Sequence, residues 1–300
     1  MRLFQQKHLL VCPQCKAVKL DFLPHLIKCT SCAAKFTQVG DDWLNLMPNQ
    51  LVKNNEVNQW QERLIEMEGW YQDLSLNTES LNNCFLSDYS PYAPLLATIS
   101  GDVLDIGGGI GLPRHYLPPN TNYIVIDPSL EWLKTDWSSL IDSFPCLEKK
   151  PDFIQGIGEY LPFPSQSFDA VLSFWSLNHA SDPKLVFSEV ARVLRPNGKF
   201  LIVLEDMIPQ WLDLLNPMFP AKKVFNSFFY LLHPKLAQKI FPRFHMFIKL
   251  LTYEQWPLQN DHICILGSEI KDWAGYNFDI TRRVWINQYL TFELRKKRTK

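Results

Sequence analysis

The stretch 103–111, which reads VLDIGGGIG, constrains the fold of this chain more than any other segment. Apolar residues and one carboxylate, Asp105, run directly into a group of glycines, which predicts a buried strand that ends in a tight turn. Glycine lacks a Cβ and adopts positive φ, so the backbone of such a turn can approach a ligand closely. The helix that follows usually presents free N–H groups and its positive dipole end to that ligand. Gly107, Gly109 and Gly111 give G-x-G-x-G, whereas the dinucleotide fingerprint is G-x-G-x-x-G, so the spacing favours a nucleotide-like ligand other than NAD.

The length, composition and net charge are those of an ordinary soluble enzyme. The chain has 300 residues, enough for one large α/β domain and a small module, and its net charge of −1 gives no overall attraction to nucleic acid. The first residues lack the apolar stretch of a signal peptide, and no run reaches the roughly 18 apolar residues of a membrane span. We therefore expect a cytoplasmic protein without a transmembrane segment, whose thiols stay reduced.

Downstream of the glycine turn, the pattern predicts strands that alternate with helices. Residues 112–117 are expected to begin a helix, with Pro113 in its first turn. Strands are expected at 123–126, 152–155, 167–174 and 199–204, with a helix over 188–194 and a turn at 196–198. This alternation predicts an α/β fold, a doubly wound and mostly parallel Rossmann-like sheet that binds its ligand at the carboxyl ends of the strands.

Asp127 directly follows the second of these strands. A carboxylate at that place can accept hydrogen bonds from both hydroxyls of a ribose. Pro128 and Ser129 come next, so a helix N-cap is the structural alternative, and the two roles can coexist.

Several motifs together resemble a known enzyme family. In this order and spacing, VLDIGGGIG, the acid of VIDP, GEYLPFPSQSFDAVLS and SEVARVLRPNGKFLIV are similar to class I S-adenosylmethionine-dependent methyltransferases of the Methyltransf_11 type. The resemblance covers about 103–203 and a terminal strand near 283–294. It implies S-adenosylmethionine as the cofactor, with Asp105 and the glycine turn at the methionine moiety and Asp127 at the ribose.

The same resemblance assigns the two ends of the cofactor. The turn formed by Ile157, Gly158 and Glu159 would lie beside the adenine. Ser173 and Phe174 would lie under the methionine end. The family often has Asp where Ile157 stands, so backbone contacts and apolar packing are expected to replace a hydrogen bond to the adenine amino group.

The cofactor's methyl group is already activated, which limits what the protein must add. Methyl transfer mainly needs an aligned acceptor in a dry pocket. A general base is needed only when the acceptor carries a proton. His179, just past the fourth strand, is the candidate catalytic base, and a structural histidine is the alternative.

Four of the seven cysteines form two C-x-x-C pairs, Cys12 with Cys15 and Cys29 with Cys32. The residues between the pairs leave room for one short hairpin, which would bring the pairs together. Four thiolates at this spacing suit tetrahedral zinc in a closed structural site. Four thiols without a metal are the alternative. A redox role is weaker, because neither pair follows a strand and opens a helix.

The cysteine segment, 1–48, resembles two known zinc ribbons. Its motifs are LLVCPQCKAVKL, IKCTSCAAKF and DDWLNLMP. One similar ribbon is the Trm112-like zinc ribbon, and the other precedes the methyltransferase domain of bacterial 23S rRNA guanine-N1 methyltransferases. Ribbons bind RNA, bind proteins or only stabilise, so the resemblance leaves the role open. Basic residues are scattered among acidic ones here, which is poor support for an RNA surface.

The rest of the chain is expected to be helical around the sheet. Residues 49–97 are predicted to form a helical bridge, in which a tyrosine, Tyr89 or Tyr92, either covers the ligand or packs on the surface. Residues 207–258 form an insert rich in aromatic residues and broken by prolines. We expect a helical cap over an apolar or bulky acceptor; a helical layer with its own core and shallow contact with a membrane surface are the alternatives.

The cofactor-binding domain therefore comprises 98–206 and 259–300. A capped helix is expected over 268–273 and the final strand over 281–293. The basic tail after it is read as a solvated end, with RNA contact as the alternative.

We interpret the chain as a methyltransferase for a small-molecule acceptor that is apolar, a saccharide or another metabolite. An rRNA or tRNA base methyltransferase that grips RNA through the ribbon is the alternative, which the near-neutral charge and the apolar insert disfavour. A non-catalytic protein that binds the cofactor or a partner is a third possibility. The intact glycines and both acids argue for cofactor binding but say nothing about turnover.

Overall fold

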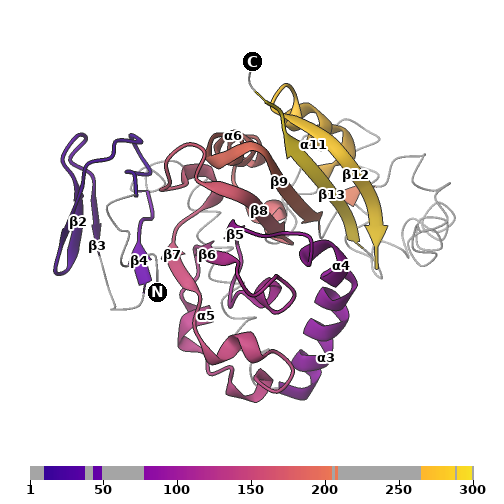
Figure 1. The fold of residues 1–300 in the computed structure, drawn as a ribbon. Helices are drawn as coiled ribbons and strands as arrows, with labels where there is room; N and C mark the ends of the chain where they lie inside the picture. Colours follow the sequence, from indigo (N-terminus) through magenta and orange to yellow (C-terminus); the bar gives the residue numbers. More distant parts are fainter. Residues whose placement is uncertain are drawn as a thin grey trace, which may run out of the picture.

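The computed structural model describes residues 10–37, 43–48, 78–204, 207–208, 265–287 and 289–298. The predicted bridge before residue 78, and the predicted cap apart from residues 207 and 208, lie outside the described residues. A large sheet runs through the centre of the molecule, and a small sheet of the amino-terminal segment lies beside it (Figure 1).

Eight strands form the large sheet. Their bounds are β4 Trp43–Asn45, β5 Asp102–Ile106, β6 Asn122–Asp127, β7 Asp152–Gln155, β8 Phe168–Phe174, β9 Leu194–Leu204, β12 Phe278–Ile286 and β13 Tyr289–Lys296. They lie in the order β12-β13-β9-β8-β5-β6-β7-β4. From β9 to β4 all neighbours are parallel, and β13 is antiparallel to both β9 and β12. The predicted doubly wound, mostly parallel α/β sheet is confirmed.

Short helices and single turns connect the strands. The α-helices are α3 Thr78–Tyr89, α4 Ala93–Leu96, α5 Glu131–Lys134, α6 Pro183–Val193 and α11 Gly267–Ala274. The 3-10 turns are η3 Ser90–Tyr92, η4 Leu112–His115, η5 Ser138–Leu140, η6 Pro145–Glu148, η7 Gly158–Tyr160 and η8 Leu177–His179. A short parallel pair, β10 Met207–Ile208 and β11 Ile265–Leu266, forms a separate two-stranded sheet. In the part of the chain that the structure describes, no helix is long and apolar enough to cross a bilayer.

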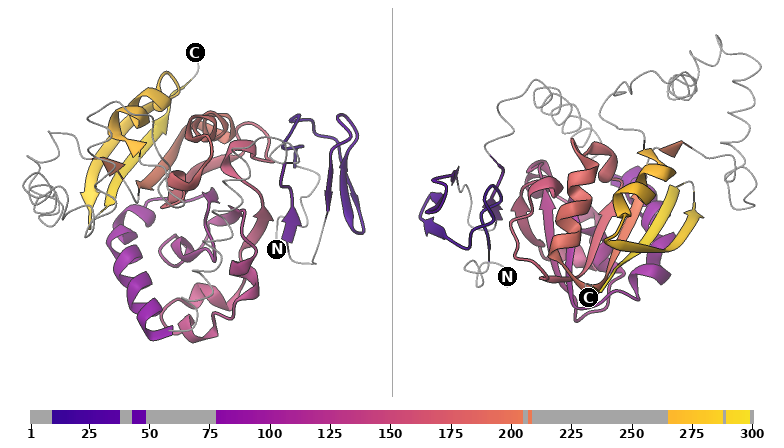
Figure 2. Two further views of the ribbon diagram at one scale, coloured as in Figure 1. Left: turned by 180° about the vertical axis from the view of Figure 1, so that it is seen from behind. Right: turned by 90° about the horizontal axis from the view of Figure 1, so that it is seen from above.

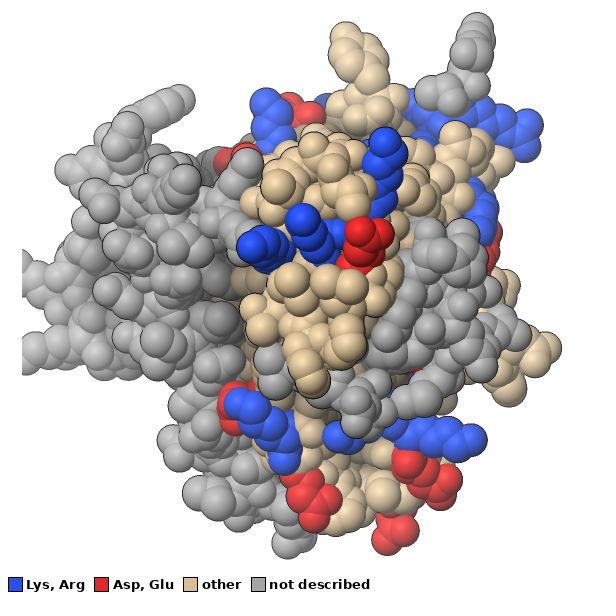
Figure 3. Space-filling view, turned by 90° about the vertical axis from the view of Figure 1, so that its left-hand side faces the viewer, with Lys and Arg blue, Asp and Glu red and all other residues tan. Residues whose placement is uncertain are grey.

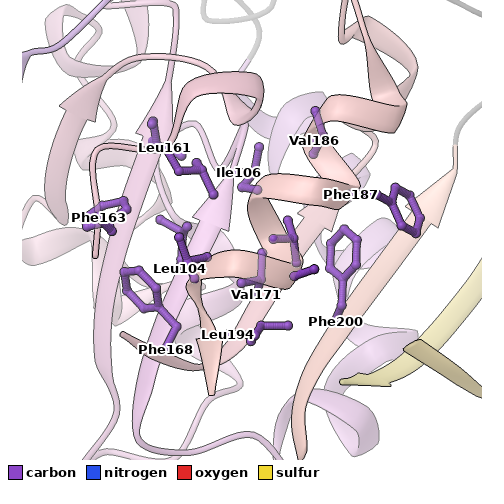
Figure 4. Close-up of a cluster of buried hydrophobic side chains, with 14 of the residues drawn as sticks. Leu104, Ile106, Leu161, Phe163, Phe168, Val171, Val186, Phe187, Leu194 and Phe200 are labelled. Carbon is purple, nitrogen blue, oxygen red and sulfur yellow. The ribbon is translucent and has the colours of Figure 1, made fainter. Parts of the chain in front are cut away.

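Different elements cover the two faces of the large sheet. Side chains alternate along a strand, so Leu104 and Ile106 of β5 point to one face and Val103 to the other. The first face packs against α6 and α11, where Val186 and Phe187 join the cluster drawn in Figure 4. The second face packs against η3 and α4. Both faces are therefore buried, as a parallel sheet requires.

The connections around the glycine turn differ from the predicted ones. The helix expected over 112–117 is only the single turn η4, because two prolines follow at 118 and 119 and β6 begins soon afterwards. The helix expected over 188–194 begins earlier, at Pro183. Asp182 caps it there, since its Oδ1 accepts a hydrogen bond from Leu185 N at 2.9 Å.

Two strand predictions also need correction. The turn expected at 196–198 lies inside β9, where Asn197 has a φ of 65° and the register with β8 shifts. The single final strand expected over 281–293 was wrong, because the segment is a hairpin of β12 and β13. Asn287 has a φ of 57° between them, a left-handed conformation that asparagine tolerates.

The cysteine segment forms a small antiparallel sheet of β1 Leu20–Leu23, β2 Leu26–Cys29 and β3 Lys35–Thr37. The hairpin of β1 and β2 lies between the two cysteine pairs, as predicted. The two views of Figure 2 show this ribbon beyond one edge of the large sheet and the β12–β13 hairpin at the opposite edge.

β4 ties the amino-terminal segment into the large sheet. The predicted boundary at residue 48 assigns this strand to the ribbon, but Trp43 pairs with Phe153 of β7, and Leu46 N donates to Gln155 O at 2.9 Å. Leu44 and Leu46 are fully buried, so the strand contributes core residues as well as backbone hydrogen bonds. The strand shows no local signal for this distant pairing.

A charge cluster fastens the ribbon to α6. Lys16, with a φ of 59°, directly follows Cys15, and its Nζ lies 2.5 Å from Oε2 of Glu189. The same oxygen accepts from Leu161 N at 2.8 Å, and Arg192 Nε donates to the other oxygen at 2.8 Å. Burial raises the pKa of Glu189, but Arg192 and Lys16 outweigh this and hold the pKa below its usual value. The ribbon is thus joined to the turn that follows η7.

Candidate functional site

The predicted cofactor residues gather at the carboxyl ends of β5, β6, β7 and β8. Asp105 stands opposite Val125 of β6 and Leu172 of β8, and Asp127 stands opposite Gln155 of β7. The turns that follow these strands therefore share one edge of the sheet, which is where a parallel sheet binds ligands.

The glycine turn has the backbone that its sequence predicts. Gly107, Gly109 and Gly111 have φ values of 66°, 52° and 76°, all in the left-handed region that favours glycine. A Cβ on Gly107 would lie only 2.3 Å from the Cβ of Ser176, in the loop after β8. The turn is therefore closed against that loop, and a larger residue at 107 would force the two apart.

Asp105 is a buried carboxylate with only one of its two oxygens hydrogen-bonded. The residue is 1% exposed, and one oxygen accepts a hydrogen bond from the hydroxyl of Tyr123. The other oxygen, Oδ1, has no hydrogen-bond partner among the described residues. Burial raises the pKa of Asp105 to about 7, which the Tyr123 bond lowers and the charge of Asp127 raises. A cationic ligand beside Asp105 would stabilise its charged form.

Asp127 braces the glycine turn from the end of β6. Its Oδ2 accepts from Gly109 N at 3.0 Å, and its Oδ1 accepts from Ser129 N at 2.9 Å. It does not cap a helix, since the N-cap of α5 is Leu130. These two bonds place the carboxylate beside the glycine turn, at the carboxyl end of β6.

The predicted adenine turn lies at η7, and its acidic side chain has a structural partner. Oε1 of Glu159 accepts from Ser181 N at 2.8 Å and from Ser181 Oγ at 2.9 Å, which ties the turn to the loop before α6. A Cβ on Gly158 would lie 2.9 Å from Cγ2 of Ile106, so this glycine permits close packing at the end of β5. Ile157 is buried beside them.

The end of β8 carries hydroxyl and aromatic side chains. The Oγ atoms of Ser173 and Ser176 are 2.7 Å apart, and Ser176 Oγ donates to Ile106 O at 2.6 Å. Phe174 stacks on Tyr89 of α3, with ring centroids 5.8 Å apart. His179 is half-buried on η8, and its backbone N–H donates to Ser176 O at 3.0 Å. His179 thus lies in the segment that follows β8, the strand that ends with the predicted methionine-end residues.

Two tryptophans at this edge were missed by sequence reasoning. Trp132 lies over the glycine turn, because a Cβ on Gly109 would be 3.0 Å from its ring, and it stacks on Trp137. Trp175 has a φ of 53°, which costs a bulky residue about 1–3 kcal/mol. The sequence shows that Trp175 follows a buried strand, but nothing in the residue types around it indicates a left-handed backbone.

The four cysteines converge as a zinc site requires. All four sulfur atoms lie within 4.8 Å of one another. The Sγ atoms of Cys12 and Cys32 are 3.7 Å apart, and those of Cys15 and Cys29 are 3.6 Å apart. Sulfurs about 2.3 Å from a common tetrahedral centre lie about 3.8 Å from one another, so the donor set and its geometry fit zinc.

Comparisons with known proteins identify a methyltransferase domain in the centre of the chain. Residues 104–202 match the family described as "Methyltransferase domain". A sterol 24-C-methyltransferase of Gibberella zeae is 34% identical over 98 residues, which cover 33% of this chain and 26% of that protein. A ubiquinone/menaquinone biosynthesis C-methyltransferase of Hahella chejuensis is 32% identical over 105 residues, 34% of this chain and 41% of that protein. The matches thus span less than half the length of either relative.

Solved structures are similar at lower identity. A 1,6-didemethyltoxoflavin-N1-methyltransferase of Burkholderia thailandensis is 12% identical, with 93% of this chain and 100% of that chain covered and a TM-score of 0.48. A chain from the complex of the Haloferax volcanii Trm112 methyltransferase activator with a methyltransferase is 14% identical, with 78% and 98% covered and a TM-score of 0.49. By the family match over 104–202, this part of the chain is the methyltransferase domain that the sequence motifs predicted.

Proposed function

We propose that this protein is an S-adenosylmethionine-dependent methyltransferase for a small-molecule acceptor. The observation that carries the proposal is the buried Asp105 carboxylate, whose Oδ1 has no hydrogen-bond partner in the described part of the chain. Such a group is stabilised when a cationic ligand meets it. S-adenosylmethionine carries two such groups, its α-amino group and its sulfonium. The left-handed glycines beside Asp105 support close approach of the backbone to the same ligand.

Each predicted residue has a binding task in this proposal. Asp105 would accept a hydrogen bond from the amino group of the methionine moiety. Asp127, at the carboxyl end of β6, would accept hydrogen bonds from the ribose hydroxyls. Ile157 and Gly158 would supply packing and backbone contacts to the adenine, while Glu159 holds that turn against α6.

When bound, the cofactor supplies an activated methyl group. The chain then has to align the acceptor nucleophile and exclude water, and the rings of Phe174 and Trp175 offer an apolar wall for this purpose. His179 would remove a proton only from an acceptor that carries one. Full turnover by a His179→Ala variant would exclude that role.

A small apolar acceptor is the favoured substrate class. The names of the similar relatives refer to sterol and quinone methylation, which supports an apolar acceptor. For the RNA alternative a continuous basic surface is expected. On the face shown in Figure 3, the described Lys and Arg side chains lie in separate groups, several beside Asp or Glu, which gives this alternative little support.

Labelled cofactor separates these alternatives in one experiment. A cell lysate is incubated with the protein and with S-adenosylmethionine that carries a tritiated methyl group. Label in the organic extract supports the small-molecule acceptor, and label in the RNA fraction supports the RNA alternative. Label in neither fraction, together with micromolar cofactor binding in calorimetry, supports a non-catalytic binding protein.

We further propose that the four cysteines hold a structural zinc ion in a cytoplasmic protein. The fit of the sulfur positions to a tetrahedron supports the metal. Reduced thiolates of this kind persist in the cytoplasm, which supports the location. Metal analysis of the purified protein by mass spectrometry, with one zinc per chain expected, tests the first proposal.

A further inference from the structure

We infer that Trp175 determines acceptor specificity, and that the acceptor carries a planar ring with a hydrogen-bond-accepting oxygen. Trp175 follows β8 directly, between Phe174 and Ser176. The inference rests on the proposed methyltransferase function and names the substrate class of that same site. Three observations on the residue carry it: its backbone, the rings around it and its indole N–H.

The backbone of Trp175 is held in a conformation that tryptophan rarely adopts. Its φ is 53°, in the left-handed region. Glycine adopts this conformation at no steric cost, whereas a residue with a Cβ does not. Hydrogen bonds to two strands hold it there. Trp175 N donates to Val203 O of β9 at 2.9 Å, and Oγ of the next residue, Ser176, donates to Ile106 O of β5 at 2.6 Å. A strained backbone of this kind persists where the surrounding structure fixes it, and such residues are frequent at ligand sites.

Rings from separate parts of the chain surround the indole. Tyr89 of α3 lies 5.0 Å away, Phe174 of β8 5.5 Å and Tyr289 of β13 5.2 Å between ring centroids, all edge-to-face. Tyr92 of η3 lies 6.2 Å away. Edge-to-face aromatic walls pack well against another planar ring. The cluster therefore favours a flat apolar molecule over a saccharide.

The indole N–H supplies the polar part of the recognition. Nε1 of Trp175 is buried and has no hydrogen-bond partner within the described ranges. The hydroxyl of Tyr92, in the same cluster, is not the partner of this N–H and instead donates to Ile286 O at 3.4 Å. An indole N–H only donates, so the ligand atom that satisfies it must accept, as an enol, phenol or carbonyl oxygen does.

The position of Trp175 connects this group to the cofactor residues. Its neighbour Ser176 is the residue that closes against Gly107 of the glycine turn. Its other neighbour, Phe174, is predicted to lie at the methionine end. A ring held by Trp175 would therefore lie at the end of the site where methyl transfer takes place.

Nuclear magnetic resonance of the indole N–H groups tests this inference directly. The protein, labelled with ¹⁵N and saturated with S-adenosylhomocysteine, is titrated with p-cresol and, separately, with toluene, which lacks the oxygen. We expect the Trp175 N–H resonance to move downfield with p-cresol and not with toluene. Trp137 is the internal control, because its Nε1 already donates to Trp132 O at 2.9 Å and should not respond.

Two variants assign the resonance and test the binding. Trp175→Phe removes the N–H and keeps a ring, and Trp175→Gly removes the ring but relieves the left-handed backbone. We expect both to bind S-adenosylhomocysteine within about twofold of wild type in calorimetry and to bind p-cresol at least fivefold more weakly. A Trp175 resonance that ignores p-cresol, or responds equally to toluene, overturns the inference. Failure of the wild type to bind S-adenosylhomocysteine refutes the proposed function instead.

Discussion

Asp105→Asn should make the empty protein more stable at pH 8 while it weakens cofactor binding. The asparagine side chain keeps an oxygen for the hydroxyl of Tyr123 and replaces the unsatisfied Oδ1 with an amide group of the same size. It removes the buried negative charge, which nothing in the described structure neutralises. Stability and binding should therefore change in opposite directions.

The magnitude follows from the pKa of this carboxyl. Burial raises it from an ordinary 3.8 to about 7, and each tenfold change in proton affinity corresponds to about 1.4 kcal/mol, which bounds the effect at about 4 kcal/mol. The folded chain binds this proton more tightly than the unfolded chain, so the stabilisation is complete below about pH 4 and is lost as the pH rises through about 7. The variant also weakens the bond from Tyr123, so we expect a gain of about 2 kcal/mol at pH 8 and little difference near pH 4.

Urea denaturation at pH 4 and pH 8 measures this difference. Calorimetry with S-adenosylhomocysteine measures the loss of binding, which we expect to reach at least tenfold. Asp142→Asn is the matched control, because that side chain is exposed and outside the site. An Asp105→Asn protein that is less stable than wild type at pH 8, or that binds the cofactor product unchanged, would refute the reasoning.

Three further predictions concern the turn, the interface and the metal. Gly107→Ala should lower the free energy of unfolding by about 1–3 kcal/mol in urea titrations, because its Cβ would clash with Ser176. Glu189→Gln should cost about 2 kcal/mol, since it leaves two cations without their carboxylate at a partly exposed interface. A zinc chelator should lower the melting temperature of wild type, and Cys15→Ser should lower it without chelator, while Cys84→Ser, outside the cysteine cluster, should not.

Each of these predictions has its own contrary result. Wild-type stability of the alanine variant would mean that the loop after β8 gives way at little cost. A Glu189→Gln protein that unfolds like wild type would show that the interface is held by apolar packing alone. Equal melting temperatures with and without chelator, in protein shown to contain zinc, would remove the structural role of the metal.

The parts of the fold that local patterns encode could be predicted from the sequence. The strand expected at 152–155 is β7, because an apolar run between turn residues is a local signal. The hairpin between β12 and β13 was missed, since its turn is marked by Asn287 without a neighbouring glycine. The pairing of β4 with β7 joins segments far apart in the chain, which no window of sequence contains.

The site divides in the same way. The glycines, Asp105 and Asp127 belong to a motif with fixed spacing, and the structure brings them to one edge of the sheet. The partner of Asp105, Tyr123, depends on the register between two strands. The unusual backbone of Trp175 depends on hydrogen bonds that it and Ser176 donate to β9 and β5. Neither feature can be derived from residue types alone.

The parallel pairing of β4 with β7 also fixes an order of events during synthesis. Trp43 leaves the ribosome well before its partner Phe153, and at cellular elongation rates the interval is roughly ten seconds. Throughout that interval Leu44 and Leu46, which are fully buried in the finished fold, have no sheet to join. The small sheet and its four cysteines can come together early, but the attachment of this segment to the rest of the molecule must wait until the centre of the large sheet exists. The nascent chain thus carries an apolar segment that chaperones can bind, and a chain lacking residues 43–48 would leave β7 as an open edge for aggregation.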